Sequence, residues 1–322
     1  MTWLLTGGAG YIGAHVLRAL RSSGRAVVVV DDLSTGHAEV VPADVPLVRA
    51  DVRDREALTR VMAEHGVVGV VHLAAKKAVG ESVAQPLRYY RENVDGALAL
   101  AEAMLDAGVM RIVYSSSAAV YGAVDVALVT EDVPTQPVSP YGETKLVGEW
   151  VFRDAAVAHG FAVTALRYFN VAGAGSDELG DTAVANLIPM VMRAHARGER
   201  PQIFGADYPT PDGTCVRDYI HVADLADAHV AAAAALERAD PGFAAYNIGR
   251  GTGSSVREVV ASVAAAMGTE LDAEVVGRRP GDPALLVASA DRATAELGWT
   301  ATRDLDAMTA SAWSAFRAGH RG

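Results

Sequence analysis

Residues 3–13 constrain the fold of this chain most, because a short apolar strand leads directly into a glycine-rich turn. Gly7, Gly10 and Gly13 give the spacing G-x-x-G-x-x-G, and a helical run follows at residues 14–21. A residue without a Cβ suits the tight turn, the close approach of a pyrophosphate, and the packing of the helix against the strand. The N–H groups at the start of such a helix can bind a phosphate. The pattern therefore predicts a dinucleotide-binding unit.

A second apolar run, at residues 26–30, ends in Asp31 and Asp32. An acidic side chain at the end of the second strand can accept hydrogen bonds from the adenine-side ribose hydroxyls, which favours NAD over NADP. We therefore expect NAD as the cofactor, with Asp31 as the ribose ligand and Asp32 as its neighbour. The alternative is a purely structural Rossmann domain that binds no dinucleotide.

Apolar strands alternate with amphipathic helical runs as far as about residue 169. The further expected strands are 45–50, 67–73, 111–115 and 163–168, and helices between them include 56–64 and 96–106. Such alternation predicts an α/β fold with a Rossmann-type, doubly wound parallel sheet, whose ligands lie at the carboxyl ends of the strands.

The pattern loosens after residue 170, which predicts a division of the chain. We expect an NAD-binding Rossmann domain at 1–170, to which some later segments return, and a smaller C-terminal α/β substrate lobe at 171–322. Residues 317–322 are expected to be a frayed tail.

Tyr141 and Lys145 stand at positions i and i+4, which share one face of a helix. Ser139 and Pro140 precede them as the expected N-cap and first helical residue. A cation held close to a phenol favours the phenolate, so the pair can supply a base at neutral pH. On its own the spacing is weak, because most such pairs form a solvated helix face. The predicted nicotinamide cofactor makes a catalytic pair the preferred interpretation.

Three serines, at positions 115, 116 and 117, follow the expected strand 111–115 and can meet the Tyr141 helix across the cofactor. A serine hydroxyl both donates and accepts, so it can relay a proton or hold a sugar hydroxyl. The alternative is that these serines only end the strand. We select Ser117 as the third member of the catalytic set.

The composition limits partners and location. The chain has 39 acidic and 28 basic residues and a net charge of −11, so we expect no nucleic-acid surface. Cys215 is the only cysteine, so we expect no disulfide, no metal site and a small, semi-buried thiol. The chain opens on a strand, and the apolar run 222–236 carries Asp224 and His229, so we expect neither a signal peptide nor a membrane span. A cytoplasmic protein is the resulting expectation.

Further motifs are distributed over most of the chain. They are Lys77-Ala-Val-Gly-Glu-Ser-Val83, Val120-Tyr-Gly122, Ser139-Pro-Tyr-Gly142, Leu166-Arg-Tyr-Phe-Asn170, Ile203-Phe-Gly205, Asp207-Tyr-Pro-Thr210, Asp212-Gly-Thr214, Val216-Arg-Asp-Tyr-Ile-His-Val222 and Arg278-Arg-Pro-Gly-Asp282. With these motifs the chain resembles, nearly from end to end, the UDP-glucose 4-epimerase (UDP-galactose 4-epimerase) family of the extended short-chain dehydrogenase/reductase superfamily. The glycine turn and the Tyr/Lys pair occur throughout the superfamily. The Lys77 run and the block 207–221 are typical of a much smaller group of proteins within it.

The resemblance implies inversion at C4 of a UDP-hexose, without net redox. Tyr141, supported by Lys145 and Ser117, would take the proton of the sugar 4-hydroxyl while the C4 hydride passes to tightly held NAD. The 4-keto sugar would turn about its diphosphate link, and the hydride would return to the opposite face. Such a pocket must hold the nucleotide firmly and the sugar loosely. The resemblance also implies a homodimer.

The resemblance assigns the remaining binding residues. Besides the glycines, its NAD contacts map to Tyr11, Ile12, Asp31, Asp51, Val52, Leu73, Lys77, Asn93 and Phe169. Its UDP contacts map to Asn170, Asn186, Leu187, Arg217, Arg279 and Asp282. Arg217 and Arg279 also suit a diphosphate chemically, because a planar guanidinium can donate two parallel hydrogen bonds, although a lone arginine is usually a surface salt-bridge partner. His221 is expected to be structural.

Three positions depart from the family pattern. Lys76 adds a second cation where the family usually has an apolar residue, and Glu92 stands where some members carry an amide. Leu286 falls where the family varies the residue that limits sugar size. The choice between hexoses and N-acetylhexosamines therefore stays open.

Several alternative functions remain. One is a 4-epimerase acting on another UDP-sugar, such as an N-acetylhexosamine, a pentose or a uronate. A nucleotide-sugar 4,6-dehydratase needs an acid pair directly after its Ser/Thr, where this chain has Ala118 and Ala119. A non-catalytic NAD-binding regulator would not need an intact Tyr141 and Lys145.

Overall fold

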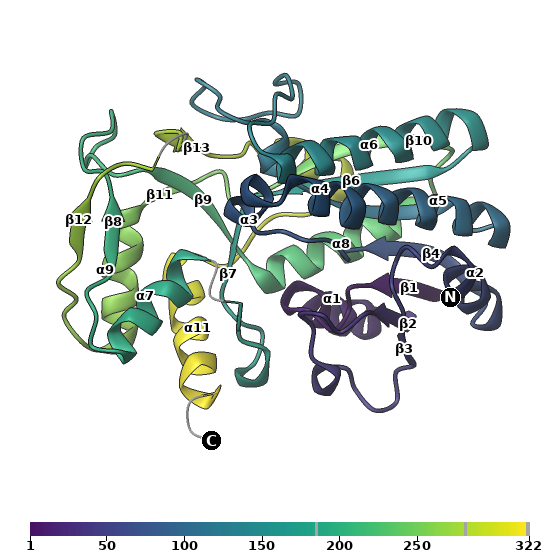
Figure 1. The fold of residues 1–322 in the computed structure, drawn as a ribbon, viewed down its shortest axis with the longest axis horizontal. Helices are drawn as coiled ribbons and strands as arrows, with labels where there is room; N and C mark the ends of the chain where they lie inside the picture. Colours follow the sequence, from purple (N-terminus) through teal and green to yellow (C-terminus); the bar gives the residue numbers. More distant parts are fainter. Residues whose placement is uncertain (184–185, 280–281, 320–322) are drawn as a thin grey trace.

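The fold centres on a large parallel sheet (Figure 1). A computed structural model describes residues 1–183, 186–279 and 282–319, and in these residues the sheet has seven strands in the order β3-β2-β1-β4-β5-β6-β10. The strands are β1 (Thr2–Thr6), β2 (Ala26–Asp31), β3 (Leu47–Arg49), β4 (Val67–His72), β5 (Arg111–Ser117), β6 (Ala162–Tyr168) and β10 (Gly242–Ile248). The direction of winding reverses between β1 and β4, which is where such sheets open a crevice for ligands. The predicted Rossmann-type sheet is confirmed.

Helices cover both faces of this sheet. One layer contains α1 (Tyr11–Ser22), α8 (Val222–Leu236) and α10 (Asp291–Leu297), and the other contains α2 (Arg55–Glu64), α5 (Asp95–Ala107) and α6 (Pro140–His159). Trp3 and Leu5 of β1 pack with the first layer, whereas Leu4 packs with the second. Because both faces are buried, the strands are continuously apolar, as expected for a parallel sheet.

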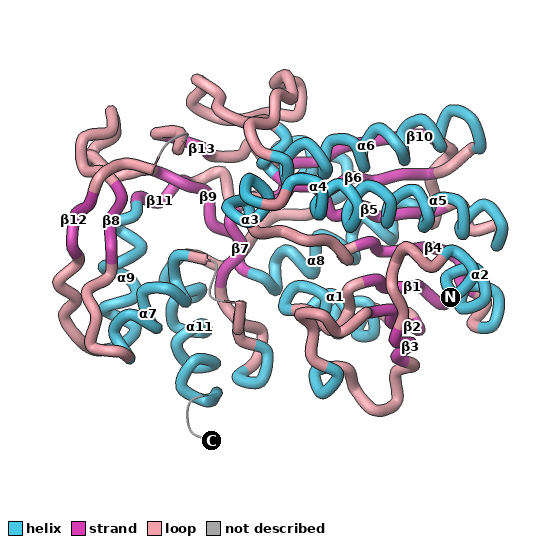
Figure 2. Tube along the Cα trace, viewed as in Figure 1, coloured by secondary structure: helices cyan, strands magenta, loops and turns pink. Residues whose placement is uncertain are grey.

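The smaller lobe lies at one end of the large sheet (Figure 2). Its central strand β9 (Val216–His221) pairs with β7 (Asn170–Ala172), β11 (Gly253–Ser255) and β13 (Leu285–Leu286), while β8 (Gln202–Phe204) pairs with β12 (Glu274–Val276). Helices α7 (Leu187–Ala196), α9 (Val256–Met267) and α11 (Leu305–Gly319) share the core of the lobe. The domain boundary near residue 170 stays a prediction. The pairing of β10 with β6 agrees with the expectation that some later segments return to the first sheet.

Short helical elements complete the fold. They are α3 (Val79–Ala84), α4 (Pro86–Tyr89), a π turn (Tyr90–Val94), and the 3-10 turns Ala38–Val40, Ala118–Val120 and Asp177–Leu179. The predicted frayed tail is wrong for residues 317–319, which end α11, and residues 320–322 lie outside the described part of the chain. No helix in the described ranges is both long and apolar enough to cross a membrane.

Candidate active site

The glycine turn joins β1 to α1 at the carboxyl edge of the sheet. Gly7 has a φ of 73°, in the left-handed region that favours glycine, and a Cβ there would lie 2.8 Å from the backbone nitrogen of Ala74. A Cβ on Gly13 would lie 2.1 Å from the carbonyl oxygen of Gly7. Helix α1 begins at Tyr11 after Gly10 with no side-chain cap, so the N–H donors of its first turn can receive an anion. This local geometry fits a pyrophosphate cradle.

Asp31 ends β2 beside this turn. Its Oδ2 accepts from the backbone N–H of Ala9 at 3.0 Å, and its Oδ1 accepts from that of Leu33 at 2.9 Å. The carboxylate is buried, which raises its pKa, while these two backbone donors act in the opposite direction. Because each carboxylate oxygen can accept more than one hydrogen bond, Asp31 is held in place and can still accept from ribose hydroxyls.

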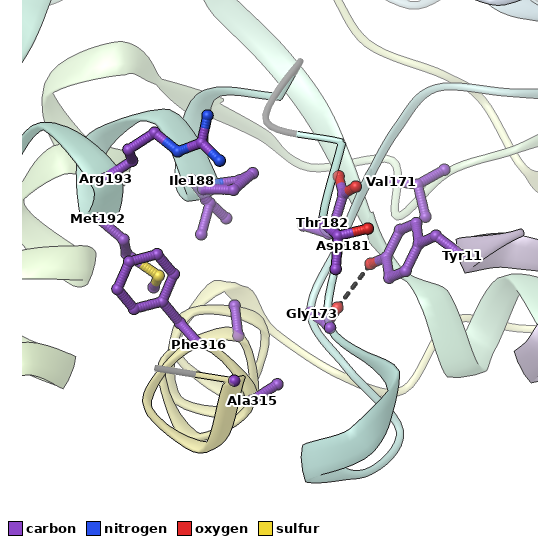
Figure 3. A pocket seen from close by; sticks show the side chains of 15 residues that line it. Tyr11, Val171, Gly173, Asp181, Thr182, Ile188, Met192, Arg193, Ala315 and Phe316 are labelled. Atoms are coloured by element: carbon purple, nitrogen blue, oxygen red, sulfur yellow. Dashed lines mark hydrogen bonds between the residues drawn. The ribbon is translucent and has the colours of Figure 1, made fainter. Parts of the chain in front are cut away.

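Tyr11 and Ile12, both predicted cofactor contacts, start α1. The Tyr11 hydroxyl donates to the carbonyl oxygen of Gly173 at 2.5 Å, which connects the glycine turn to the segment after β7 (Figure 3). A cavity of about 170 Å³ lies beside this contact, and Ile188, Met192 and other residues of the smaller lobe line it. The side chain of Ile12 packs against the main core. The side chain of Tyr11 thus joins the two parts of the molecule, and the N–H donors of the α1 turn remain for the cofactor.

Asn93 connects the segment after β4 to α6. Its Oδ1 accepts from the backbone N–H of Lys76 at 2.8 Å, and its Nδ2 donates to the Lys76 carbonyl and to the Thr144 hydroxyl, each at 3.0 Å. The Lys76 ammonium donates to the Ser34 hydroxyl in the loop after β2 at 2.9 Å. Lys77 is exposed beside it. The extra cation therefore joins the loops after β2 and β4 across the carboxyl ends of the strands.

The remaining predicted cofactor contacts lie around the same edge. Asp51 binds the Arg53 guanidinium through both carboxylate oxygens, and this contact lowers the pKa of Asp51. Val52 lies against Gly96 of α5. The backbone N–H of Leu73 donates to the Thr6 carbonyl at 3.1 Å. Phe169 is buried in a small apolar cluster with Ala118, Tyr121 and Ala288.

The sequence signals correctly predict the start of α6. The Ser139 hydroxyl accepts from the backbone N–H of Gly142 at 3.3 Å, and Pro140 is the first helical residue. The helix presents Tyr141 and Lys145 toward the end of β5, where Ser117 also lies, and all three side chains are buried. The Lys145 ammonium donates to the carbonyl oxygen of Ser115 at 2.8 Å. The fold therefore gathers the predicted catalytic set.

The electrostatics of this set differ from the sequence expectation. Burial raises the pKa of Tyr141, and a hydrogen bond with Ser117 acts in the opposite direction. Burial lowers the pKa of Lys145 to about 8. Burial therefore acts against the phenolate that the Tyr/Lys spacing predicts, and the Lys145 ammonium is bonded to the Ser115 carbonyl. That the Lys145 cation favours the phenolate stays a prediction. A further positive charge beside the phenol would lower its pKa.

A second cavity, of about 960 Å³, opens between α7, β8 and β9. It brings together all of the predicted UDP contacts, which are Asn170, Asn186, Leu187, Arg217, Arg279 and Asp282. The first turn of α7, beginning at Leu187, faces this space and offers N–H donors suited to a phosphate.

The two predicted arginines of this cavity are held differently. The Arg217 guanidinium donates to the carbonyl oxygens of Val216 and Pro283, and its Nη2 lies 3.6 Å from the Asp282 carboxylate. The Arg279 guanidinium lies 3.7 Å from the ring centroid of Phe204. Both cations line the cavity, where each can donate hydrogen bonds to a diphosphate. Pro280 and Gly281 of the same motif lie outside the described residues.

Sequence reasoning missed several residues of the site. Arg193 and Arg197 line the nucleotide cavity from α7 and just after it, and Arg200 lines it from the following loop. The i, i+4 spacing of the first two, just after the predicted Asn186 and Leu187 contacts, was the available signal. His221 caps α8 by accepting from the Ala223 N–H at 3.0 Å, in line with its expected structural role. Cys215 is buried and lines the same cavity. Within the described ranges, no three metal-ligating side chains gather.

Comparison with known proteins agrees with this geometry. Residues 3–249 match the model of the NAD dependent epimerase/dehydratase family. The UDP-glucose 4-epimerase of Azospirillum brasilense is 50% identical over 97% of this chain and 90% of its own length, and that of Bacillus subtilis is 45% identical over 97% and 96%.

Solved structures give the same result. A UDP-glucose-4-epimerase from Stenotrophomonas maltophila with bound NAD and formylated UDP-arabinopyranose has a TM-score of 0.96 and 42% identity, over 100% of this chain and 99% of the other. The enzyme of Bifidobacterium longum in complex with NAD⁺ and UDP has a TM-score of 0.92 and 39% identity, over 98% of both chains. The chain therefore belongs to the NAD-dependent epimerase/dehydratase family and, within it, to the UDP-glucose 4-epimerases.

Proposed function

We propose that this protein interconverts UDP-glucose and UDP-galactose by NAD-dependent inversion at C4, through a transient 4-keto sugar. The observation that carries the proposal is that one molecule holds a buried Tyr141–Lys145–Ser117 set and a cavity with all the predicted UDP contacts. Half of its residues are also identical to those of a UDP-glucose 4-epimerase over nearly its whole length. The cofactor is NAD, which suits the acidic Asp31 at the end of β2.

The catalytic set can move one proton reversibly. Bound NAD supplies the acceptor for the C4 hydride and a positive ring charge that favours ionisation of a nearby phenol. The Tyr141 phenolate takes the proton of the sugar 4-hydroxyl, and the Ser117 hydroxyl can hold that oxygen or relay the proton. The Lys145 ammonium is fixed by the Ser115 carbonyl, so its charge stays close to the α6 face that carries Tyr141. The same groups return the proton once the keto sugar has turned.

The nucleotide cavity explains how the sugar can turn without being lost. The guanidinium groups of Arg217 and Arg279 and the first turn of α7 hold the diphosphate by its charge. Asn170, Asn186 and Asp282 offer further polar contacts to the nucleotide. Tight binding of the nucleotide leaves the hexose free to present either face to the hydride, whereas equally tight sugar binding would slow the reaction.

The sugar preference is proposed from Leu286 of β13. This side chain packs against the apolar cluster that contains Ala118, Tyr121 and Phe169. Ala118 is the residue directly after Ser117 in the chain. From the resemblance to the family, we propose that this leucine limits the size of the substituent at C2 and favours a hexose. A 4-epimerase acting on UDP-N-acetylhexosamines is the second candidate, and a panel of UDP-sugars separates the two.

The test is direct. Purified protein should carry NAD and convert UDP-galactose to UDP-glucose, with the change at C4 followed by NMR and without added NADPH. Tyr141→Phe should keep the NAD and lose turnover. Wild-type protein that retains NAD but converts no UDP-sugar would refute the proposal and favour a non-catalytic NAD-binding protein. Release of a 4-keto-6-deoxy sugar would instead favour a dehydratase, although Ala118 and Ala119 supply no acid for water elimination.

A cytoplasmic homodimer is the proposed working form. Leu98 of α5 is 45% exposed, and Trp150 and Val157 of α6 are 45% and 87% exposed, so these two packed helices present three large apolar side chains to water. Burying that surface in a second copy would remove it from water. Light scattering should give twice the mass of one chain, and Trp150→Glu should lower it; a single-chain mass for the wild type at micromolar concentration would contradict the proposal.

A further inference from the structure

A buried ion pair lies behind the catalytic set. Glu149 of α6 and Arg167 of β6 have side chains that are only 3% and 8% exposed. Arg167 donates from Nε to Oε1 of Glu149 at 2.9 Å and from Nη2 to Oε2 at 2.6 Å, which is a bidentate contact. Burial acts to lower the pKa of Arg167, but the Glu149 carboxylate outweighs it and raises that pKa, so the guanidinium stays charged.

Hydrogen bonds extend this pair to other elements. The Ser116 hydroxyl of β5 donates to Oε1 of Glu149, and Nη1 of Arg167 donates to the Tyr121 hydroxyl at 2.9 Å. The Tyr121 hydroxyl in turn donates to Oδ1 of Asn247 in β10 at 2.7 Å. The five side chains are all buried, and together they join α6, β5, β6, β10 and the turn after Ser117.

The position of the pair relates it to catalysis. Glu149 lies at i+4 from Lys145 and i+8 from Tyr141, so the three side chains follow one face of α6. Ser116 precedes Ser117 in β5 and is the register partner of Arg167 in β6. The pair therefore attaches the face of α6 that carries the base to the strand that carries its serine partner. None of its members lines the nucleotide cavity described above.

Stability alone is a poor explanation for such a pair. Removing two charges from water costs about as much as their attraction returns, and apolar residues of similar size are often as stable or more stable. A bidentate contact does, however, fix distance and orientation more narrowly than apolar packing. Catalysis is sensitive to such geometry, since a misplacement of about 1 Å can lower a rate roughly 100-fold.

We propose that Glu149 and Arg167 are positioning residues for the epimerisation, which set the spacing between Tyr141 and Ser117 without touching the substrate. The proposal rests on the proposed function. Glu149 and Arg167 both lie outside the predicted catalytic and binding residues. Two results should follow. Loss of the pair should lower kcat strongly while it changes the thermal stability little, and it should weaken the hydrogen bond between Ser117 and Tyr141.

The decisive variant replaces both members, as Glu149→Met with Arg167→Met. A single replacement would leave an unpaired buried charge and can prevent folding, whereas the double replacement leaves none. The NAD-loaded double variant should keep its thermal midpoint within a few degrees of the wild type. Its kcat should fall about 10- to 100-fold while KM changes less than about threefold. Loss of the Ser117 hydrogen bond should also move the rising limb of the kcat–pH profile to higher pH, because that bond lowers the pKa of Tyr141.

Two further variants complete the design. Arg167→Lys keeps the charge but loses the bidentate contact, so it should show the same pattern in a milder form. Arg55→Met is the matched control, because Arg55 makes an exposed bidentate contact from α2 to Asp106 of α5, at 2.7 and 2.9 Å, away from the site. Its kcat and pH profile should match those of the wild type.

The outcomes are distinct. A folded double variant or Arg167→Lys with kcat within about twofold of the wild type would reject the proposal, as would a fall in kcat with an unshifted pH profile. If neither variant folds, the pair is needed for folding itself and the proposal is also rejected. A wild-type protein that turns over no UDP-sugar would overturn the proposed function instead, and that control is measured first.

Discussion

Replacing Lys145 by methionine should separate the stability of this protein from its catalysis. The lysine is 3% exposed, and burial lowers the pKa of its ammonium group from 10.5 to about 8. One pKa unit corresponds to about 1.36 kcal/mol, so the difference between 10.5 and about 8 corresponds to roughly 3 kcal/mol against the charged form in the folded protein. Methionine has a similar length and no charge, so it avoids this cost.

The sign follows from proton linkage. Between about pH 8 and pH 10.5 the unfolded chain holds the Lys145 proton while the folded chain has lost it, so the free energy of unfolding rises with pH in this window. Below pH 8 the full roughly 3 kcal/mol opposes folding of the wild type. The stability of Lys145→Met relative to the wild type should therefore be greatest near pH 7 and should fall by about 3 kcal/mol by pH 10.5.

Urea unfolding of cofactor-free protein, measured for both proteins from pH 7 to pH 10.5, gives this difference. All other titrating groups are common to the two proteins and cancel in the comparison. The kcat of the NAD-loaded variant should fall by about 100-fold or more, because a fixed charge beside the reacting groups is lost. A stability difference that stays constant within about 1 kcal/mol over the whole pH range would refute the reasoning.

Four further changes test the site. Tyr141→Phe removes the base and should lower kcat by about 10²- to 10⁴-fold with NAD content unchanged; retained turnover would exclude Tyr141 as the base. Asp31→Ala removes the predicted ribose acceptor and should raise the NAD dissociation constant about tenfold or more, as measured by calorimetry, whereas unchanged affinity would disprove the assignment. Arg217→Lys keeps the charge but loses the planar fork, so KM for UDP-galactose should rise several-fold more than kcat falls, and an unchanged KM would place the diphosphate elsewhere. Leu286→Ala should improve kcat/KM for UDP-N-acetylgalactosamine relative to UDP-galactose, and an unchanged ratio would show that Leu286 does not limit sugar size.

The elements around the cofactor site were predictable because their signals are local. The glycine spacing, the acid after the second strand and the cap before Tyr141 each act within a few residues, and the structure has β1, α1, β2 and α6 where these signals predict them. The alternation of strands and helices likewise predicts the parallel sheet. The error at residues 317–319 arose because α11 is stabilised by packing against the smaller lobe, for which a terminal segment gives no local signal.

The smaller lobe was less predictable because long-range contacts form it. Its central strand β9 pairs with β7, β11 and β13, which are short and far apart in the sequence. The residues proposed to hold UDP came from a resemblance to a family, and no periodicity in this chain predicts that they share one cavity. Arg193 and Arg197 were missed although they stand at positions i and i+4, because only the cavity that α7 shares with β8 and β9 shows that they face the same space as the predicted UDP contacts.

The sequence by itself determined which chemical groups are present and where the first strands and helices begin. Glycines, caps and i, i+4 spacing act through neighbouring backbone, so their effect can be inferred without a fold. Only the tertiary structure decided the protonation behaviour of the site. Burial raises the pKa of Tyr141 and lowers that of Lys145, and the Lys145 ammonium binds the Ser115 carbonyl, all of which depend on neighbours that the sequence does not order in space. The pairing of Glu149 with Arg167 behind the site is of the same kind, because it exists only where α6 packs on the sheet.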